Sequence, residues 1–469
     1  MLHYLRREPG FYKRLFLLAL PLILQNLITT SLGFVDTFMV GLLGDTQLSA
    51  VTAANAPIFL VQVIIFGLMS GLTILVSQFW GKADMPAIVN RKRKVTATLQ
   101  TGLEKTCAQL KVRVVYGKAE LASAKLVRVT TAEGMEEVES DNVIIATGSS
   151  PLELPALPVD HARVLSSDDA LELQAVPASL IIVGGGVIGC ELAFIYRAFG
   201  SKVTVVEGQN RVLPLPSVDE EISRLLQREM KKKGIAVELA RTVTATTPTG
   251  TGVSVEIGAS PFVEMANPPA PRTLEADAVC VTVGRVPHTA GVKVDARGWI
   301  EADDFLETSA PGVYAIGDVI GPRRIMLAHM AVAEAHTAVH NILHPEDRKA
   351  QRYDVVPSAI FTAPEIGDVG LSEAQAKQQG FAVKTSVFQF RELGKAQAMG
   401  ELAGLFKLVV EEGSGKLLGA HIAGAHASDL IAEATLAIQR GCTARDLFET
   451  IHAHPTLSEG IYEAAGSLV

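Results

Sequence analysis

Cysteine is scarce in this chain of 469 residues, and its four copies lie far apart. Cys107, Cys190, Cys280 and Cys442 have no other cysteine within a few residues. This spacing argues against a disulfide framework and is typical of a reducing compartment. It also gives no local pair of thiols that could cycle between dithiol and disulfide during catalysis, which needs a thiolate beside its partner.

A surplus of positive charge is lacking too. The formal net charge is −8, so binding to nucleic acid has no electrostatic support. The length is sufficient for about three domains of ordinary size.

Charge of either sign is nearly absent from one region. Between Leu15 and Gly81 there is no Lys or Arg, and the only acids are Asp36 and Asp45. Such a stretch is atypical of a soluble domain, and the charge density becomes ordinary only beyond Lys92.

Two apolar segments fill this region, Leu15–Val35 and Pro57–Gln78. Each has about twenty residues, the length that crosses a bilayer as a helix. Basic residues flank them on the outer sides only, namely Arg6, Arg7, Lys13, Arg14, Lys82, Arg91, Lys92, Arg93 and Lys94. By the positive-inside rule, residues 1–91 are predicted to form a transmembrane hairpin with both ends in the cytoplasm. Two buried helices of a soluble domain are the alternative.

The hairpin region resembles the amino-terminal end of multidrug and toxin extrusion (MATE) transporters, over Leu18–Gly44 and Ser70–Asp84. Transport is not expected, because such transporters bind substrate between two halves built from many helices. Asp36 is therefore expected at the membrane interface rather than in a binding site.

From residue 92 onward, strand-like runs alternate with helical patterns, which predicts an α/β chain with parallel sheet. Val112–Leu121 and Asn142–Pro151 are predicted strands that end in glycine-containing turns.

The most specific local motif follows a buried strand at Ser179–Val183. Gly184, Gly186 and Gly189 form a G-x-G-x-x-G turn, and a helical pattern runs on to Phe199. Such glycines allow a tight turn, close approach of a pyrophosphate and close packing of helix on strand. A glycine-rich turn without a ligand is the alternative.

A second strand ends in Glu207, 23 positions after Gly184. An acid at this point accepts hydrogen bonds from a ribose 2′-hydroxyl and repels a 2′-phosphate, so NAD is favoured over NADP.

Three later segments complete the α/β pattern. Thr246–Arg272 is a predicted surface hairpin, and Ala276–Thr289 a buried strand ending in Gly284 and Arg285. Thr308–Gly321 is a strand with Asp318 at its carboxyl edge, where it could bind sugar or ribityl hydroxyls or simply cap a helix.

Together with Met326–Ala335, Val356–Glu373 and Ile451–Ala465, these segments resemble the pyridine nucleotide-disulfide oxidoreductases, and most closely the dihydrolipoyl dehydrogenases. The resemblance covers about four-fifths of the chain. It implies a two-dinucleotide-fold flavoprotein, with an FAD domain in two parts, an NAD-binding Rossmann-like domain and a C-terminal α+β dimerisation domain. The implied boundaries are 92–150 and 286–349 for FAD, 151–285 for NAD, and 350–469 for dimerisation.

The resemblance also implies the site residues. NAD would contact Gly184, Gly185, Gly186, Val187, Ile188, Gly189, Glu191, Glu207, Val243 and Gly284, and FAD would contact Gly117, Gly148, Asp318 and Ala328.

His454 and Glu459 would be the acid–base pair for a lipoyl-type dithiol, with Glu459 orienting the ring; a capping or core histidine is the alternative. A homodimer is implied, whose C-terminal domain completes the partner's active site. No metal site is implied.

In this family, the amino-terminal region supplies a first G-x-G-x-x-G, an acid for the FAD ribose and a C-x4-C redox pair, and none of these is present. We therefore expect the first FAD βαβ unit to be missing, tight FAD binding to be lost and the full reaction to be impaired. The alternatives are a membrane-tethered NAD-binding or dimerisation module on the cytoplasmic face, and a spliced chimaera joined near Asn90–Lys94.

Overall fold

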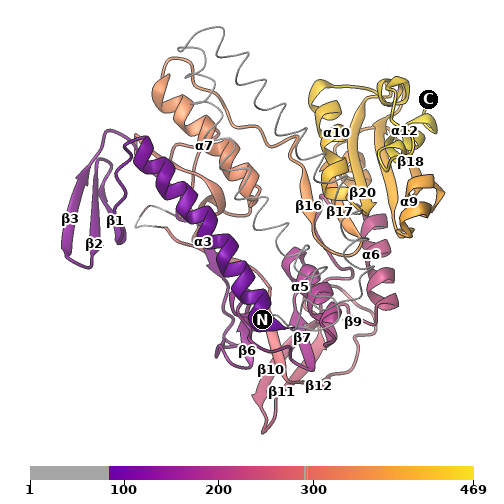
Figure 1. Cartoon of the computed structure of the whole chain (residues 1–469), viewed down its shortest axis with the longest axis horizontal. Helices are drawn as coiled ribbons and strands as arrows, with labels where there is room; N and C mark the ends of the chain where they lie inside the picture. Colours follow the sequence, from indigo (N-terminus) through magenta and orange to yellow (C-terminus); the bar gives the residue numbers. More distant parts are fainter. Residues whose placement is uncertain (1–83, 290–291, 293) are drawn as a thin grey trace, which may run out of the picture. The chain divides into compact units, whose positions relative to one another are not determined.

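The computed structural model describes residues 84–289, 292 and 294–469 (Figure 1). The two apolar segments and Asp36, predicted to form a membrane hairpin, lie outside these residues. Over the described ranges, no helix is both long and apolar enough to cross a bilayer. Helix α3 (Met85–Gln109) has 25 residues but includes Arg91 to Lys94, and it is continuous through the point where the transporter-like sequence ends.

A five-stranded parallel sheet in the order β6-β13-β7-β8-β9 forms the centre of the predicted NAD-binding domain. Its strands are β6 (Val164–Ser166), β7 (Ser179–Val183), β8 (Lys202–Val206), β9 (Ala236–Glu238) and β13 (Ala278–Val281). Helices α4 (Ser167–Ala170), α5 (Val187–Ala198) and α6 (Glu220–Lys232) belong to the same unit. The predicted strand, glycine turn, helix and second strand are thereby confirmed.

Burial explains why β7 is the central strand. Leu180, Ile181, Ile182 and Val183 are each at most 5% exposed, as expected for a parallel strand covered on both faces. On α6, Ile222, Leu225, Leu226 and Met230 are buried; their spacing of three and four residues places them on one helical face.

An antiparallel three-stranded sheet covers the NAD unit. It consists of β10 (Arg241–Pro248), β11 (Val253–Ala259) and β12 (Arg272–Ala276). The alternate residues Val253, Val255 and Ile257 are almost fully buried, because a strand that packs one face on a core buries every second side chain. The prediction of a surface hairpin over Thr246–Arg272 is correct for the β10–β11 turn and the loop before β12, but wrong for β11, whose alternate side chains belong to the core.

The predicted FAD part contains a second set of elements of the same kind. After α3 come the antiparallel strands β1 (Lys118–Ser123), β2 (Leu126–Thr131) and β3 (Gly134–Glu139). Strand β4 (Val143–Ile145) pairs in parallel with β15 (Val313–Ala315), and β5 (Ser149–Pro151) pairs with β14 (Arg285–Pro287). The 3-10 helix η2 (Gly317–Ile320) and helix α7 (Ala328–Leu343) follow β15.

The two sets correspond in order. Helix α3 corresponds to α6, and the segment 112–117 to β9. The sheet β1–β3 corresponds to the sheet β10–β12, and the strand pair β4–β15 to the pair β13–β6. In the NAD unit, the sequence between β6 and α6 also contains β7, α5 and β8. Within the described residues, the FAD part includes no counterpart of that β7-α5-β8 unit.

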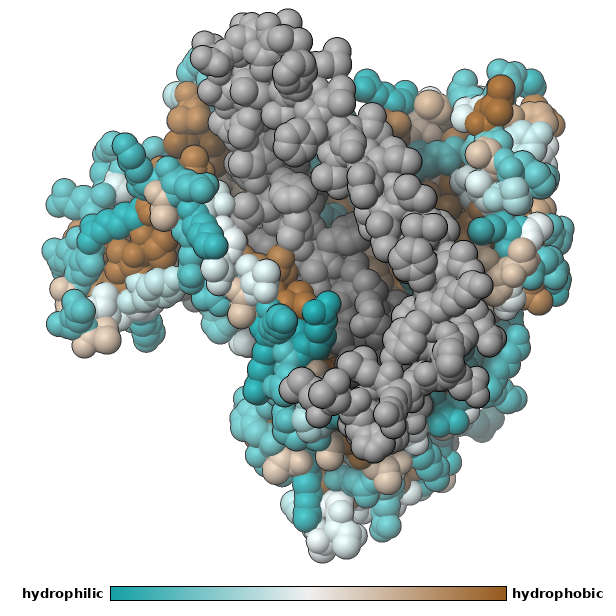
Figure 2. All heavy atoms as spheres, viewed as in Figure 1, coloured by the Kyte–Doolittle hydropathy of each residue, from teal (hydrophilic) through white to brown (hydrophobic). Residues whose placement is uncertain are grey.

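The strand predicted over Val112–Leu121 is wrong in its first half. Residues 112–117 form no strand, and β1 begins at Lys118. Val112, Val114 and Tyr116 are 52%, 49% and 69% exposed. A strand needs a neighbour for its backbone hydrogen bonds, and no described strand pairs with this segment. Apolar surface is visible among hydrophilic side chains at the β1–β3 end of the molecule (Figure 2).

The C-terminal part of the chain has the α+β arrangement that the family resemblance implies. Its antiparallel sheet has the order β16-β17-β20-β19-β18. The strands are β16 (Ser358–Ile360), β17 (Glu365–Gly370), β18 (Val383–Gln389), β19 (Leu405–Glu411) and β20 (Leu417–Gly424). The helices are α8 (Glu373–Gln378), η3 (Phe390–Glu392), α9 (Gly394–Met399), α10 (Ala427–Arg440), α11 (Ala444–Glu449) and α12 (Glu459–Gly466).

A buried lysine joins this unit to the NAD unit. The ammonium of Lys407, only 3% exposed, lies 3.0 Å from Asp219, 3.0 Å from Glu221 and 2.7 Å from Glu373. Burial alone would lower the pKa of Lys407, but hydrogen bonds to Glu373 and Glu221 outweigh it and raise that pKa. Burial likewise opposes ionisation of Asp219, yet the Glu221 amide and Lys407 hold the Asp219 pKa below its usual range.

Replacing Lys407 with methionine should destabilise the protein strongly. The change leaves the buried Asp219 carboxylate without its cation, which typically costs about 3–5 kcal/mol. Urea unfolding at neutral pH measures this loss. Because the Asp219 pKa is depressed in the folded state, its share of the stability is present above the unfolded pKa and is lost as the pH falls through the folded pKa.

The matched control is Lys377→Met. Lys377 pairs with the same Glu373 but is 60% exposed, so its removal should cost about 0.5 kcal/mol or less. Equal losses for the two variants would contradict this account of the buried cluster.

Candidate functional site

The turn after β7 has two glycines that the fold requires and one that it leaves open. Gly184 has a φ of +108°, and a Cβ there would lie 2.7 Å from the Thr282 carbonyl oxygen. A Cβ on Gly189 would collide with the carbonyl oxygen of Gly184. At Gly186, the N-cap of α5, an added Cβ would meet nothing within 4 Å. The amino end of the twelve-residue α5 is therefore open to an anionic group.

Glu207 lies across this turn at the end of β8. Its Oε2 accepts from the Gly185 amide at 2.6 Å, and its Oε1 accepts from the Gln209 amide at 2.7 Å. Each carboxylate oxygen keeps a second lone pair for a ribose hydroxyl. Because Glu207 is buried, its charge would act strongly against a 2′-phosphate at the same place.

The other predicted NAD residues lie along this edge. Val187 and Ile188 begin α5 and pack partly on the core. Val243 is on β10, whose first residue Arg241 bonds the Glu207 carbonyl at 3.0 Å. Gly284 comes two residues after Thr282, whose hydroxyl donates to the Gly184 carbonyl at 3.0 Å.

Glu191 connects α5 to the last domain. Its Oε1 accepts from the Phe361 amide at 2.9 Å, just after β16. Burial raises the pKa of Glu191 to about 6, and the Phe361 amide opposes that rise. The NAD helix and the dimerisation domain are therefore held by a contact that spans 170 positions of the sequence, and Phe361 escaped the sequence-based prediction for that reason.

Around Asp318, the predicted FAD residues are joined by two that were not predicted. Asp318 accepts from the Ser149 hydroxyl at 2.7 Å, and Arg285 Nε donates to the same hydroxyl at 2.7 Å. The Arg285 guanidinium also lies 3.7 Å from Asp318. Gly148, with a φ of +67°, precedes Ser149, and a Cβ there would meet nothing within 4 Å. The position of Ser149 directly after the predicted Gly148 was the one signal that could have indicated it.

The remaining two FAD predictions differ in kind. Ala328 is the first residue of the sixteen-residue α7, so its amide lies in the unsatisfied amino-terminal turn. At Gly117, a Cβ would lie 2.5 Å from the Thr130 carbonyl oxygen. Packing against β2 is therefore sufficient to explain the glycine at 117.

His454 and Glu459 form the predicted pair. His454 Nδ1 lies 2.8 Å from Glu459 Oε1, and Glu459 Oε2 accepts from the Thr456 amide at 2.8 Å. The Thr456 amide, then His454, hold the pKa of Glu459 below its usual range. With Nδ1–H directed at the carboxylate, Nε2 is the basic nitrogen. The His454 side chain is 76% exposed, so that nitrogen is open to a reactant.

None of the four cysteines forms a disulfide. Cys190 and Cys280 are fully buried, and burial raises the pKa of each thiol to about 12. Cys190 donates to the Gly185 carbonyl at 3.3 Å. A thiol with so high a pKa is not a nucleophile at neutral pH. Over the described part of the chain, no three His, Cys, Asp or Glu side chains gather as metal ligands.

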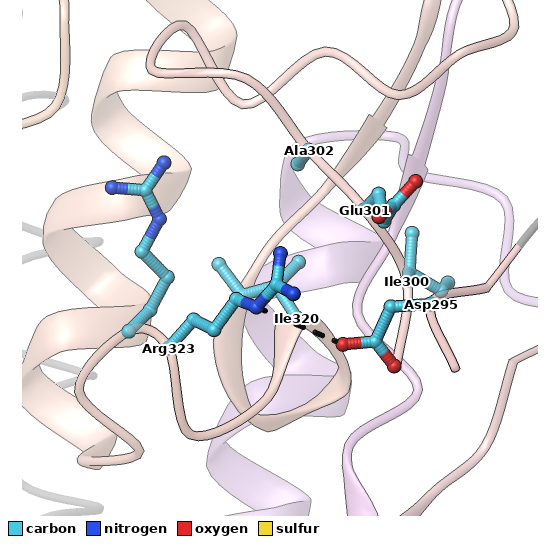
Figure 3. A pocket seen from close by; sticks show the side chains of 7 residues that line it. Asp295, Ile300, Glu301, Ala302, Ile320 and Arg323 are labelled. Carbon is cyan, nitrogen blue, oxygen red and sulfur yellow. Dashed lines mark ion pairs between the residues drawn. The ribbon is translucent and has the colours of Figure 1, made fainter. Parts of the chain in front are cut away.

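A cavity of about 420 Å³ lies beside η2 (Figure 3). Its lining consists of Asp295, Ile300, Glu301, Ala302, Ile320, Arg323 and Arg324. Both arginines of the lining have an acidic partner. Arg323 Nε lies 3.9 Å from Asp295 in the same lining, and Arg324 bonds Asp304 at 2.9 Å. No residue predicted for a dinucleotide or for proton transfer lines it.

Comparison with protein families identifies the fold. A model described as pyridine nucleotide-disulphide oxidoreductase matches residues 48–335, and the model of the corresponding dimerisation domain matches residues 356–465. The chain belongs to the pyridine nucleotide-disulphide oxidoreductase family. Members of this family bind FAD and NAD. The first match begins at residue 48 and so overlaps the apolar segment Pro57–Gln78.

Curated relatives agree. The dihydrolipoyl dehydrogenases of Chlorobaculum tepidum and Geobacillus stearothermophilus are each 39% identical to this chain, over 81% of its length and 80% of theirs. The dihydrolipoyl dehydrogenase of Chlamydia muridarum is 38% identical over the same shares. The chain is thus a dihydrolipoyl dehydrogenase-like member of the family.

Solved structures have the same fold. LpdA from Mycobacterium tuberculosis superposes with a TM-score of 0.73 at 28% identity, over 87% of this chain and 89% of that one. The HOCl-induced flavoprotein disulfide reductase RclA from Escherichia coli gives a TM-score of 0.74 at 24% identity, over 86% and 90%; at that identity the likeness concerns the fold alone.

Gly186, which is open, and Gly189, which is packed, allow a matched test of the dinucleotide turn. Gly186→Ala should cost about 1 kcal/mol or less in stability, yet weaken NADH binding about tenfold or more, because its Cβ stands where the pyrophosphate approaches. Gly189→Ala should instead destabilise the fold by about 1–3 kcal/mol through the clash with Gly184. NADH fluorescence titration and thermal unfolding measure the two effects. Unchanged NADH affinity in a folded Gly186→Ala would contradict the assignment.

Proposed function

We propose that this chain binds NAD in the turn between β7 and α5 and works as an NADH-oxidising flavoprotein that has lost the dithiol step of the dihydrolipoyl dehydrogenases. The observation that carries the proposal is a contrast. The predicted NAD cradle has an open helix terminus at Gly186 and the Glu207 carboxylate beside it. The four thiols, by contrast, are unpaired, and two of them are buried with a pKa of about 12.

FAD would be held at Asp318, Gly148 and the amino end of α7. The residues there fit a polyol: Asp318 and Ser149 offer an acceptor and a hydroxyl at the carboxyl edge of β15. FAD, when bound, supplies the acceptor for the electrons of NADH. We propose that its affinity is weak, because the described residues include no second glycine-rich turn for its pyrophosphate.

His454 would be the acid–base residue that transfers a proton to or from a thiol. Its Nε2 can take a proton from a thiol or return one, while Glu459 stabilises the resulting imidazolium through Nδ1. The strong exposure of His454 suits a residue that works in the active site of a second copy of the chain, so we propose a homodimer through residues 350–469. A lipoyl-type dithiol is the substrate that the relatives' name suggests for the family's full reaction, whose dithiol step we propose this chain has lost.

For residues 1–91 we propose a membrane hairpin related to the MATE transporters, which would hold the remainder at the cytoplasmic face. The support is the interval from Leu15 to Gly81, which has no base and only two acids. A spliced chimaera without an evolved function is the competing proposal. Carbonate extraction of membranes tests the proposed hairpin. Recovery of the chain in the extracted pellet supports the hairpin, and release into the supernatant contradicts it.

The nucleotide preference tests the NAD proposal. We expect NADH to bind at least about 100-fold more tightly than NADPH, since a buried carboxylate and a 2′-phosphate repel each other at close range. Glu207→Ala should lower this ratio mainly by weakening NADH binding and admitting NADPH. Fluorescence titration with both nucleotides measures it.

Glu229→Ala is the control for general destabilisation, because Glu229 is a buried acid of the same unit that pairs with Lys232 on α6. It should leave the NADH-to-NADPH ratio unchanged. Equal binding of the two nucleotides by the unaltered chain would contradict the proposal.

A further inference from the structure

A buried glutamate lies directly behind the turn that carries Asp318. Glu334, on α7, has no exposed surface. Its Oε2 accepts from the Gly317 amide at 2.6 Å, and its Oε1 accepts from the Tyr353 hydroxyl at 2.9 Å. Gly317 begins η2, and Asp318 is the next residue.

The turn at Gly317 packs closely against α7. Gly317 has a φ of +72°, in the left-handed region, and a Cβ there would lie 3.2 Å from Cβ of Ala331 on α7. Contact with α7 thus requires both the glycine and an acceptor for its amide. Glu334 is one helical turn beyond Ala331, which brings its carboxylate to that amide.

A buried carboxylate is costly unless its environment compensates for it. Burial raises the pKa of Glu334, and the bonds from the Gly317 amide and the Tyr353 hydroxyl oppose that rise. The Arg324 guanidinium, stacked over the Tyr353 ring with 4.7 Å to its centroid, is the nearby cation. Tyr353 lies in the segment that leads to β16, so Glu334 ties three pieces of chain together: η2, α7 and the connection to the last domain.

We propose that Glu334 is a positioning residue of the flavin site. Its carboxylate fixes the Gly317–Asp318 turn against α7 and so determines where the Asp318 carboxylate stands for the sugar hydroxyls of FAD. The inference rests on the proposed function, which places FAD at Asp318, and it assigns to the chain a residue that does not itself touch the flavin.

Two substitutions of Glu334 separate the effect of its charge from the effect of its hydrogen bonds. In Glu334→Gln, the amide oxygen can still accept from Gly317, while its NH2 donates to the Tyr353 hydroxyl, which can also accept. In Glu334→Ala, the buried Gly317 amide has no acceptor. His336→Ala is the control on the same helix, because His336 is exposed.

Two measurements on the full chain read the effect. Hydrogen exchange of a peptide over residues 313–321, without FAD, reports whether the turn is held. We expect exchange about tenfold faster or more in Glu334→Ala, a factor typical of a buried donor left without a partner, and no change in Glu334→Gln or His336→Ala. Quenching of flavin fluorescence gives the FAD affinity, which should fall by a similar factor in Glu334→Ala alone.

A double substitution excludes a merely structural role. If Glu334 acts through Asp318, adding Glu334→Ala to Asp318→Ala should weaken FAD binding by less than about twofold further, because coupled residues are not additive. Additive losses, equal defects in Glu334→Gln and Glu334→Ala, or unchanged exchange in Glu334→Ala would each overturn the inference. Failure of the unaltered chain to quench FAD fluorescence would instead refute the proposed flavin site, and the exchange data would then still decide whether Glu334 holds the turn.

Discussion

The dinucleotide site depends on the complete burial of strand β7. Its backbone is hydrogen-bonded to β13 on one side and to β8 on the other, and its four core side chains are covered on both faces. Because neighbouring parallel strands end at the same edge, Gly184, Glu207 and Thr282 come together there. The glycines at 184 and 189 are required because a Cβ at either position would collide with backbone atoms. At Gly186 a Cβ would meet no protein atom, so the space there is open.

In the flavin part of the chain, the described strand β4 has a neighbouring strand on one side only. β4 pairs with β15, but among the described residues no strand occupies its other edge, and the apolar side chains of Val112, Val114 and Tyr116 stay exposed. The side chains at Asp318 are nevertheless well ordered by Ser149, Arg285 and, through the Gly317 amide, Glu334. The weak flavin binding that we propose follows from this contrast: acceptors for a polyol at Asp318, but no pyrophosphate cradle among the described residues.

Local patterns in the sequence predicted much of this. The strand, the three glycines, the helix and the acid after the second strand lie close together in the sequence and are governed by local geometry. The pair His454 and Glu459, five positions apart, was implied by the resemblance to the family. Resemblance to the family extended the prediction to the domain order.

What the sequence could not predict are contacts between distant segments. Ser149 meets Asp318 across 169 positions, Lys407 meets Asp219 across 188, and Phe361 meets Glu191 across 170. None of these pairs has a periodicity or spacing that a local pattern could reveal. The strand predicted at residues 112–117 failed for a related reason, because a strand is stabilised by a neighbour and not by its own alternation of apolar residues.

In the proposed function, electrons from NADH reach a flavin and stop there because the chain lacks a redox pair of thiols. The most direct test is the visible flavin absorption of the full chain saturated with FAD, measured without oxygen, first after NADH and then after lipoamide. The account predicts that NADH bleaches the flavin band and that lipoamide does not restore it. Recovery of the band on adding lipoamide would show that a disulfide accepts the electrons, and would contradict the account.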